Sequence, residues 1–227
     1  KKEPRLTKEA GANRFVWNMR YPDATKVPGD KGRMSTEGLT TGPIAAPGTY
    51  QAQLKVGEQT YTQTFEIRKD PRLNADEADL VAQFEFLWSV RNKLSETHEG
   101  INKARYLKTQ ADEWTKRVEG NEGAKGVADA AKALKEKLTA IEDELIQSKA
   151  ADPRSFPSRL NARLAILGAL MEGSDDLPTQ QAREVFADLS KRIDAQLARL
   201  KDVIDTEVAV FNKLVREAGV EAMVAKA

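Results

Sequence analysis

The chain has 227 residues, of which 40% are apolar and 31% charged, so it can bury a core but keeps much solvated surface. Its 36 basic and 35 acidic side chains nearly cancel, which excludes the strongly positive field of a nucleic-acid-binding domain. The absence of cysteine excludes disulfide frameworks, thiolate zinc sites and cysteine nucleophiles. No apolar run approaches the roughly 20 residues of a membrane span.

The apolar pattern changes at Asp70-Pro71. Before this point apolar and polar residues alternate between glycines and prolines, and after it apolar residues recur every three or four positions. We therefore predict two domains, a β-rich head over residues 1–70 and a helical tail over residues 71–227. Neither domain carries a large net charge: the head has 12 basic and 8 acidic residues, and the tail has 24 basic and 27 acidic residues.

Three stretches of the head have the period of two that places one strand face on a core. They span residues 14–20, 49–56 and 61–67. Gly57-Glu58-Gln59 is typical of a tight hairpin turn between the second and third stretches. Residues 21–48 hold four prolines and five glycines and predict a long loop, with a short strand near Ile44. A two-sheet domain normally has about seven strands, so the head is expected to be an incomplete β-sandwich.

Two stretches of the head, Gly11-Ala-Asn-Arg-Phe-Val-Trp-Asn-Met-Arg-Tyr-Pro22 and Gly42-Pro-Ile-Ala-Ala-Pro-Gly-Thr-Tyr50, resemble a known pattern. They look like the immunoglobulin-like module of the flagellar hook-cap type. The chain is more closely similar to the C-terminal region of bacterial exported proteins with sortilin-like, BNR-repeat β-propellers, often described as glycosyl hydrolases. There a D-P-R hinge, matched by Asp70-Pro71-Arg72, precedes a helical segment. Asn18 replaces the usual Asp, and the chain has no propeller or Asp-box repeat.

The tail predicts four helices. Asn74 with Glu77 reads as an N-cap and its capping-box partner, so the first helix is expected to start near Ala75. Gly120, Gly123 and Gly126 predict the first turn. The second helix runs from Val127 with apolar residues at alternating steps of four and three.

The remaining boundaries follow from proline and glycine. Asp152-Pro153 is expected to end the second helix, and Pro157 to start a shorter third one. Residues 173–178 form the next turn, and the fourth helix ends at Gly219. The first and fourth helices have about 42 residues, or roughly 60 Å, and the middle two together match this length. We therefore predict an α+β chain whose tail is an elongated antiparallel bundle of three helical columns. The middle column is expected to be broken near Asp152-Pro157. The helix lengths favour this arrangement over a conventional four-helix bundle.

Chemical motifs are scarce. His98, the only histidine, lies on the first helix's apolar stripe, and neighbouring Glu99 points elsewhere, so we expect a packed histidine rather than a general base. Acidic clusters such as Asp175-Asp176 and residues 142–144 are expected in a loop and on a solvated helix face. No phosphate loop, Rossmann fingerprint, EF-hand or HExxH motif is present. We expect no catalytic residue, no cofactor and no metal.

Four residues are candidates for interaction: Trp17, Met34, Leu39 and Trp88. Trp88 is expected to pack the two domains together, and residues 21–48 form either an interaction loop or one folded against a missing part of a longer protein. The chain opens on Lys1-Lys2-Glu3-Pro4, which reads as a mature fragment or a trimmed segment.

The resemblance implies a non-catalytic C-terminal accessory module that scaffolds or docks a larger exported β-propeller protein in the periplasm or outside the cell. The alternative is part of a glycoside hydrolase or carbohydrate-binding protein, with Trp17 touching glycan. A third hypothesis is self-association through leftover apolar positions such as Leu87, Val203 and Val210. We expect no nucleic-acid partner.

Overall fold

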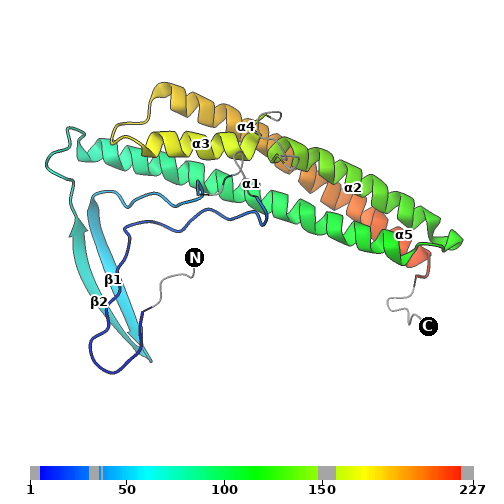
Figure 1. Ribbon diagram of the computed structural model, residues 1–227, viewed down its shortest axis with the longest axis horizontal. Coiled ribbons are helices and arrows are strands. Elements are labelled where there is room, and N and C mark those ends of the chain that lie inside the picture. Colours follow the sequence, from blue (N-terminus) through cyan, green and yellow to red (C-terminus); the bar gives the residue numbers. More distant parts are fainter. Residues whose placement is uncertain (1–5, 31–35, 37, 148–156, 221–227) are drawn as a thin grey trace.

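The computed structural model describes residues 6–30, 36, 38–147 and 157–220. It combines a two-stranded antiparallel sheet with a series of helices, so the chain has the mixed α and β content expected from its sequence. The elements in chain order are β1 Gly48–Val56, β2 Gln59–Ile67, α1 Glu77–Arg117, the 3-10 turn η1 Glu122–Ala124, α2 Lys125–Leu145, α3 Leu160–Glu172, α4 Gln180–Val203, the π-helical turn η2 Ile204–Val208 and α5 Ala209–Glu217. The sheet forms an arm that projects from one end of the helices (Figure 1).

The hairpin follows the predicted alternation. β1 and β2 pair over nine residues each, from Gly48 opposite Ile67 to Val56 opposite Gln59. Gly57 has φ of 61°, a left-handed conformation that glycine adopts without strain at the first central position of a two-residue hairpin turn. Thus the turn consists of Gly57 and Glu58, and Gln59 already belongs to β2.

The predicted first strand is wrong. Residues 14–20 are not in a strand, and only an isolated bridge joins Arg20 to Ile44. A local turn also interrupts the stretch near its end: the Asn18 side chain accepts a hydrogen bond from the Arg20 N–H at 3.0 Å, and Met19 adopts φ of 60°. The described residues therefore contain two strands, fewer than the about seven of an immunoglobulin-like sandwich.

The helices pack side by side along their lengths (Figure 1). α1 extends along the whole length of the helical part of the molecule. α3 packs along the half of α1 nearest the arm, and α2 along the other half. α4, η2 and α5 follow one another along the same helices. One cluster of buried apolar residues joins α1, α2, α3 and α4, and a second joins the far ends of α1 and α2 to α5. Burial of these stripes, rather than helix propensity, holds the helices together.

Several helix ends differ from those predicted. α1 begins two residues later, because Asp76 is the N-cap and exchanges capping-box hydrogen bonds with Asp79 at 2.8 and 3.3 Å. α3 begins at Leu160 rather than Pro157, because Arg159 is still extended. Gly126 lies inside α2, and η2 interrupts the single fourth helix that was expected. The predicted break at Asp152-Pro153 lies outside the described residues.

Candidate functional site

The segment of residues 21–28, which we call the strap, lies along α1 and connects the arm to the helices. Four α1 side chains donate to its carbonyl oxygens at 2.5 to 3.0 Å: Arg91 to Pro22 and Asp23, His98 to Thr25, Asn102 to Lys26, and Arg105 to Pro28. Ser95 accepts from the Thr25 N–H at 3.0 Å. Because these bonds are made to backbone groups, they fix the path of the strap and hold the head against α1.

His98 is the most buried of these donors, with no exposed surface. Its Nδ1 lies 2.5 Å from the Thr25 carbonyl oxygen, so Nδ1 carries the proton, and its Nε2 is 3.5 Å from the Asn161 amide nitrogen of α3. Burial lowers the pKa of His98, while the Thr25 carbonyl and the negative charge of Asp30 oppose that shift. The expected packed histidine is thus a neutral hydrogen-bonding link between the strap, α1 and α3.

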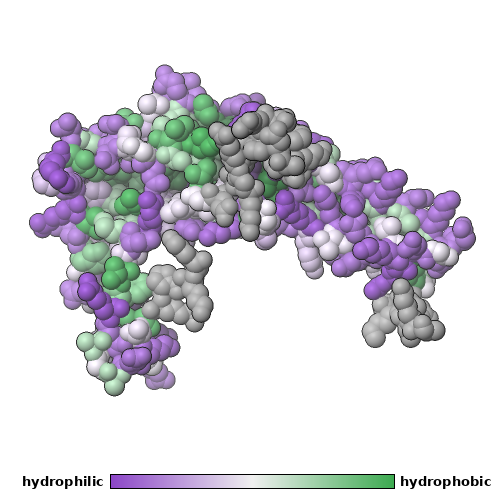
Figure 2. All heavy atoms as spheres, in the orientation of Figure 1, coloured by the Kyte–Doolittle hydropathy of each residue, from purple (hydrophilic) through white to green (hydrophobic). Residues whose placement is uncertain are grey.

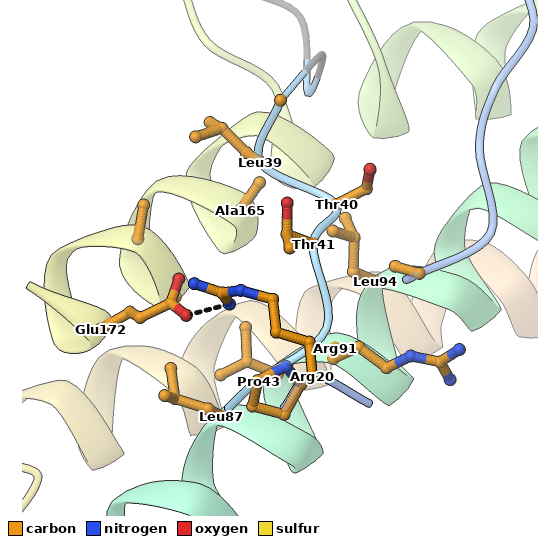
Figure 3. A pocket seen from close by; sticks show the side chains of 15 residues that line it. Arg20, Leu39, Thr40, Thr41, Pro43, Leu87, Arg91, Leu94, Ala165 and Glu172 are labelled. Atoms are coloured by element: carbon orange, nitrogen blue, oxygen red, sulfur yellow. Dashed lines mark hydrogen bonds and ion pairs between the residues drawn. The ribbon is translucent and has the colours of Figure 1, made fainter. Parts of the chain in front are cut away.

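A cleft of about 250 Å³ opens between the segment that precedes β1, α1 and α3 (Figure 3). The Arg20 guanidinium points to Glu172 at the end of α3 and donates to the Gly42 carbonyl oxygen at 2.8 Å. Gly42 is required here, because a Cβ at this position would lie 2.0 Å from the Tyr21 carbonyl oxygen. The labelled Arg91 side chain points away from Glu172 and is held by the strap. The charged groups of this cleft bind other parts of the chain, and they form the seam between head and helices.

The hairpin has one apolar and one polar face. The register places Tyr50 beside Phe65 and Leu54 beside Tyr61 on one face, together with Val56. The opposite face carries only polar residues: Thr49, Gln51, Gln53, Lys55, Thr60, Thr62, Thr64 and Glu66. Such a division is typical of a sheet that packs one face on a core.

This apolar face is largely uncovered. Leu54, Val56 and Tyr61 near the tip are 45, 58 and 56% exposed. Figure 2 shows hydrophobic residues (green) on the surface of the arm. The polar side chains of Gln59 and Gln63 share this face, and exposed apolar side chains gathered on one side of a sheet are a feature of interaction surfaces. The apolar face of the hairpin is therefore the candidate functional site.

Trp17 covers only the base of that face. Its ring centroid lies 6.2 Å from that of Tyr50 and 6.3 Å from that of Phe65, and its indole N–H donates to the Arg20 carbonyl oxygen at 3.0 Å. The Tyr50 hydroxyl donates to the Ala46 carbonyl oxygen, and burial raises the pKa of Tyr50. The cluster fixes the start of the hairpin and leaves its tip free.

The other predicted interaction residues lie elsewhere. Trp88 on α1 packs on Tyr21 and Phe84, with ring centroids 5.2 and 6.3 Å away, so it joins the strap to the helix. Leu39 packs on the main core cluster and lines the cleft. Met34 lies outside the described residues. Of the positions considered for self-association, Leu87 and Val203 are buried in the core, whereas Val210 is exposed.

One acidic residue contradicts the sequence interpretation. Glu142 was expected on a solvated helix face, but its side chain is only 4% exposed and pairs with Arg105 at 2.6 Å and Lys108 at 2.7 Å. The reason is its position on the α2 stripe, between buried Ile141 and Leu145. Within the described ranges, no group of three or more His, Cys, Asp or Glu side chains is placed to hold a metal ion.

No protein-family model, curated protein or solved structure matches this chain. None of the helices in the described parts of the chain is both long and apolar enough to cross a bilayer.

Proposed function

We propose that this chain is a non-catalytic interaction module that docks a larger protein through the apolar face of its β hairpin. The observation that carries the proposal is the uncovered face itself, with Leu54, Val56 and Tyr61 about half exposed on an arm that projects from the helices. Full burial of an apolar side chain is worth about 1.5–3 kcal/mol, and because these side chains are already about half buried, covering the rest of each gains roughly half of that.

The connection between head and helices supports the same role. The strap is held by backbone-directed hydrogen bonds from α1, and Arg20 pairs with Glu172 of α3. A docked partner would therefore be fixed relative to an elongated helical body. Its resemblance to exported propeller proteins suggests the partner, namely the β-propeller of the same larger protein, with the head as an incomplete immunoglobulin-like β-sandwich and the module in the periplasm or outside the cell.

Carbohydrate binding, the alternative, has less support. Trp17 is 36% exposed, but its indole N–H, the group that could donate to a sugar hydroxyl, already donates to the Arg20 carbonyl oxygen, and its ring packs on Tyr50 and Phe65. A calorimetric titration with glycans is expected to show no saturable binding. Binding that Trp17→Ala abolishes without unfolding the chain would favour this alternative.

The docking proposal predicts a difference between two neighbouring substitutions. Leu54→Glu places a carboxylate on the apolar face, and Gln53→Glu places the same group on the polar face of the same strand. In the complete gene product, Leu54→Glu is expected to lower the unfolding free energy by at least about 2 kcal/mol more than Gln53→Glu, because it buries an unpaired charge.

In the 227-residue chain alone the two variants are expected to differ by much less, since Leu54 is already half exposed there. Denaturant unfolding measures the unfolding free energy of each variant, Leu54→Glu and Gln53→Glu, in the complete gene product and in the 227-residue chain. Equal costs of Leu54→Glu in the two proteins would contradict docking through this face, and a gene that encodes no polypeptide beyond these residues would remove the proposed partner.

A further inference from the structure

The outer edge of β2 offers a second surface, separate from the apolar face. β2 is nine residues long and pairs only with β1 among the described residues. Its sequence, Gln-Thr-Tyr-Thr-Gln-Thr-Phe-Glu-Ile, contains no proline and no lysine, the residues that commonly protect an edge from pairing. All eight residues from Gln59 to Glu66 are exposed. An unprotected edge of this length is a template for another strand.

The hairpin geometry determines which backbone groups are free. In a two-residue hairpin the pair that flanks the turn, here Val56 and Gln59, exchanges both hydrogen bonds, and so does every second pair after it. The intervening residues of β2 direct their N–H and C=O groups outward: Thr60, Thr62, Thr64 and Glu66. Consistent with this, the Gln63 side chain donates to the Thr64 carbonyl oxygen at 3.2 Å.

β2 is nearly symmetric about Gln63. If a second copy of the strand lies antiparallel with a two-fold axis at Gln63, Tyr61 falls opposite Phe65 of the second copy and Thr62 falls opposite Thr64 of the second copy. The outward-directed residues then pair with one another, as the hydrogen-bonding pattern requires. Aromatic and Thr–Thr cross-strand pairs are both favourable.

The charges fit the same register. Continued beyond the strand, it places Glu58 of the turn opposite Arg68 of the second copy, and the two-fold axis repeats this contact. Glu66 falls opposite Thr60, so no like charges face each other along the shared edge. Opposite charges across strands stabilise the pairing, and like charges destabilise it.

We propose that two copies of this chain pair through the edges of β2, in the register centred on Gln63, and form one four-stranded antiparallel sheet. The arm projects from the end of the helical body (Figure 1). Antiparallel pairing therefore sets the base of each arm beside the tip of the other. The two helical bodies then lie at opposite ends of the shared sheet. Because the edge and the apolar face are different surfaces, the dimer does not depend on the proposed docking.

A charge-placement experiment tests the edge. Thr62→Lys/Thr64→Lys puts lysines opposite each other across the two-fold axis and is expected to weaken the dimer at least about tenfold. The matched control is Gln51→Lys/Gln53→Lys, at the register partners of those residues on β1 and on the same polar face. The control is expected to dimerise like the unchanged chain. Analytical ultracentrifugation over micromolar to hundreds of micromolar concentrations measures all three proteins.

Cross-linking tests the register, since the chain has no cysteine of its own. A non-hydrogen-bonded antiparallel pair has Cα atoms about 4.5 Å apart, within the range of a disulfide. Gln63→Cys is therefore expected to form a disulfide-linked dimer under mild oxidation, and Ala52→Cys, its register partner on β1, is not. A monomeric unchanged chain, equal behaviour of the two lysine variants, or equal cross-linking of the two cysteine variants would overturn the proposal.

Discussion

Replacing Arg105 and Lys108 together by methionine is expected to lower the free energy of unfolding by about 3–5 kcal/mol. The two cations hold Glu142, whose side chain is 4% exposed, at 2.6 and 2.7 Å. Methionine keeps most of the apolar stem of each side chain but leaves the buried carboxylate without a partner, and Arg105→Met also removes the bond to the Pro28 carbonyl oxygen, which a change at Glu142 does not restore. Denaturant unfolding of the variant and the unchanged chain measures the difference.

Two further variants separate charge burial from other causes. Adding Glu142→Leu to the double variant is expected to recover much of the loss, because an apolar group then replaces the unpaired charge. Lys135→Met breaks the exposed pair with Asp112, where both side chains are more than 40% exposed, and is expected to cost at most about 1 kcal/mol. A double variant no less stable than Lys135→Met would contradict the burial of Glu142.

Acidification from pH 7 to 5.5 is expected to destabilise the chain through His98. Burial lowers the pKa of this histidine in the folded chain, so below the ordinary value near 6.5 the unfolded chain binds more protons than the folded one. The stability that neutral, buried His98 contributes is therefore fully present above pH 6.5 and is lost as the pH falls towards the lower pKa of the folded chain. Between the two pKa values the slope approaches about 1.4 kcal/mol per pH unit.

Because the chain has one histidine, a change of stability that is lost on replacing His98 can be assigned to that residue. Protonation at Nε2 would set an N–H against the Asn161 amide, while Nδ1 already donates to Thr25. His98→Gln keeps a donor for the Thr25 carbonyl but cannot titrate, so its stability is expected to change little over the same range. Unfolding curves of both proteins at pH 7, 6.5, 6 and 5.5 give the comparison. If the unfolding free energies of the two proteins fell equally with pH, His98 would not be the cause of the acid destabilisation.

Local patterns predicted the hairpin and the helical content well. Tyr50, Leu54 and Val56 alternate with polar neighbours. Because successive side chains of a strand point to opposite faces, this alternation can be recognised from the order of the residues alone. The same alternation in residues 14–20 does not form a strand: the Asn18 side chain and the conformation of Met19 turn the chain near the end of this stretch, and only Arg20, beyond the turn, bridges to Ile44. Asn18 itself is the sequence signal of this turn, because asparagine side chains accept hydrogen bonds from the N–H two residues further on.

The strap and the buried ion cluster depend on contacts between distant residues. Arg91, Ser95, His98, Asn102 and Arg105 recur at steps of four, three, four and three. That spacing forms one stripe along α1 and indicates a polar surface that binds something. What it binds, the backbone of residues 22–28, has no sequence signature, because carbonyl groups are common to every residue. Likewise, the burial of Glu142 depends on Arg105 and Lys108 of α1, which are distant from it in the sequence.

Hydroxyl-radical footprinting of Leu54 in the complete gene product and in the 227-residue chain tests the docking role most directly. Leu54 lies on β1, away from the β2 edge, so pairing of two copies leaves it exposed. Leu170 on α3 is 64% exposed and serves as the internal reference. We predict that Leu54 is modified several-fold less in the complete product while Leu170 is unchanged. Equal modification of Leu54 in both proteins would show that the apolar face stays uncovered and would contradict the proposed function.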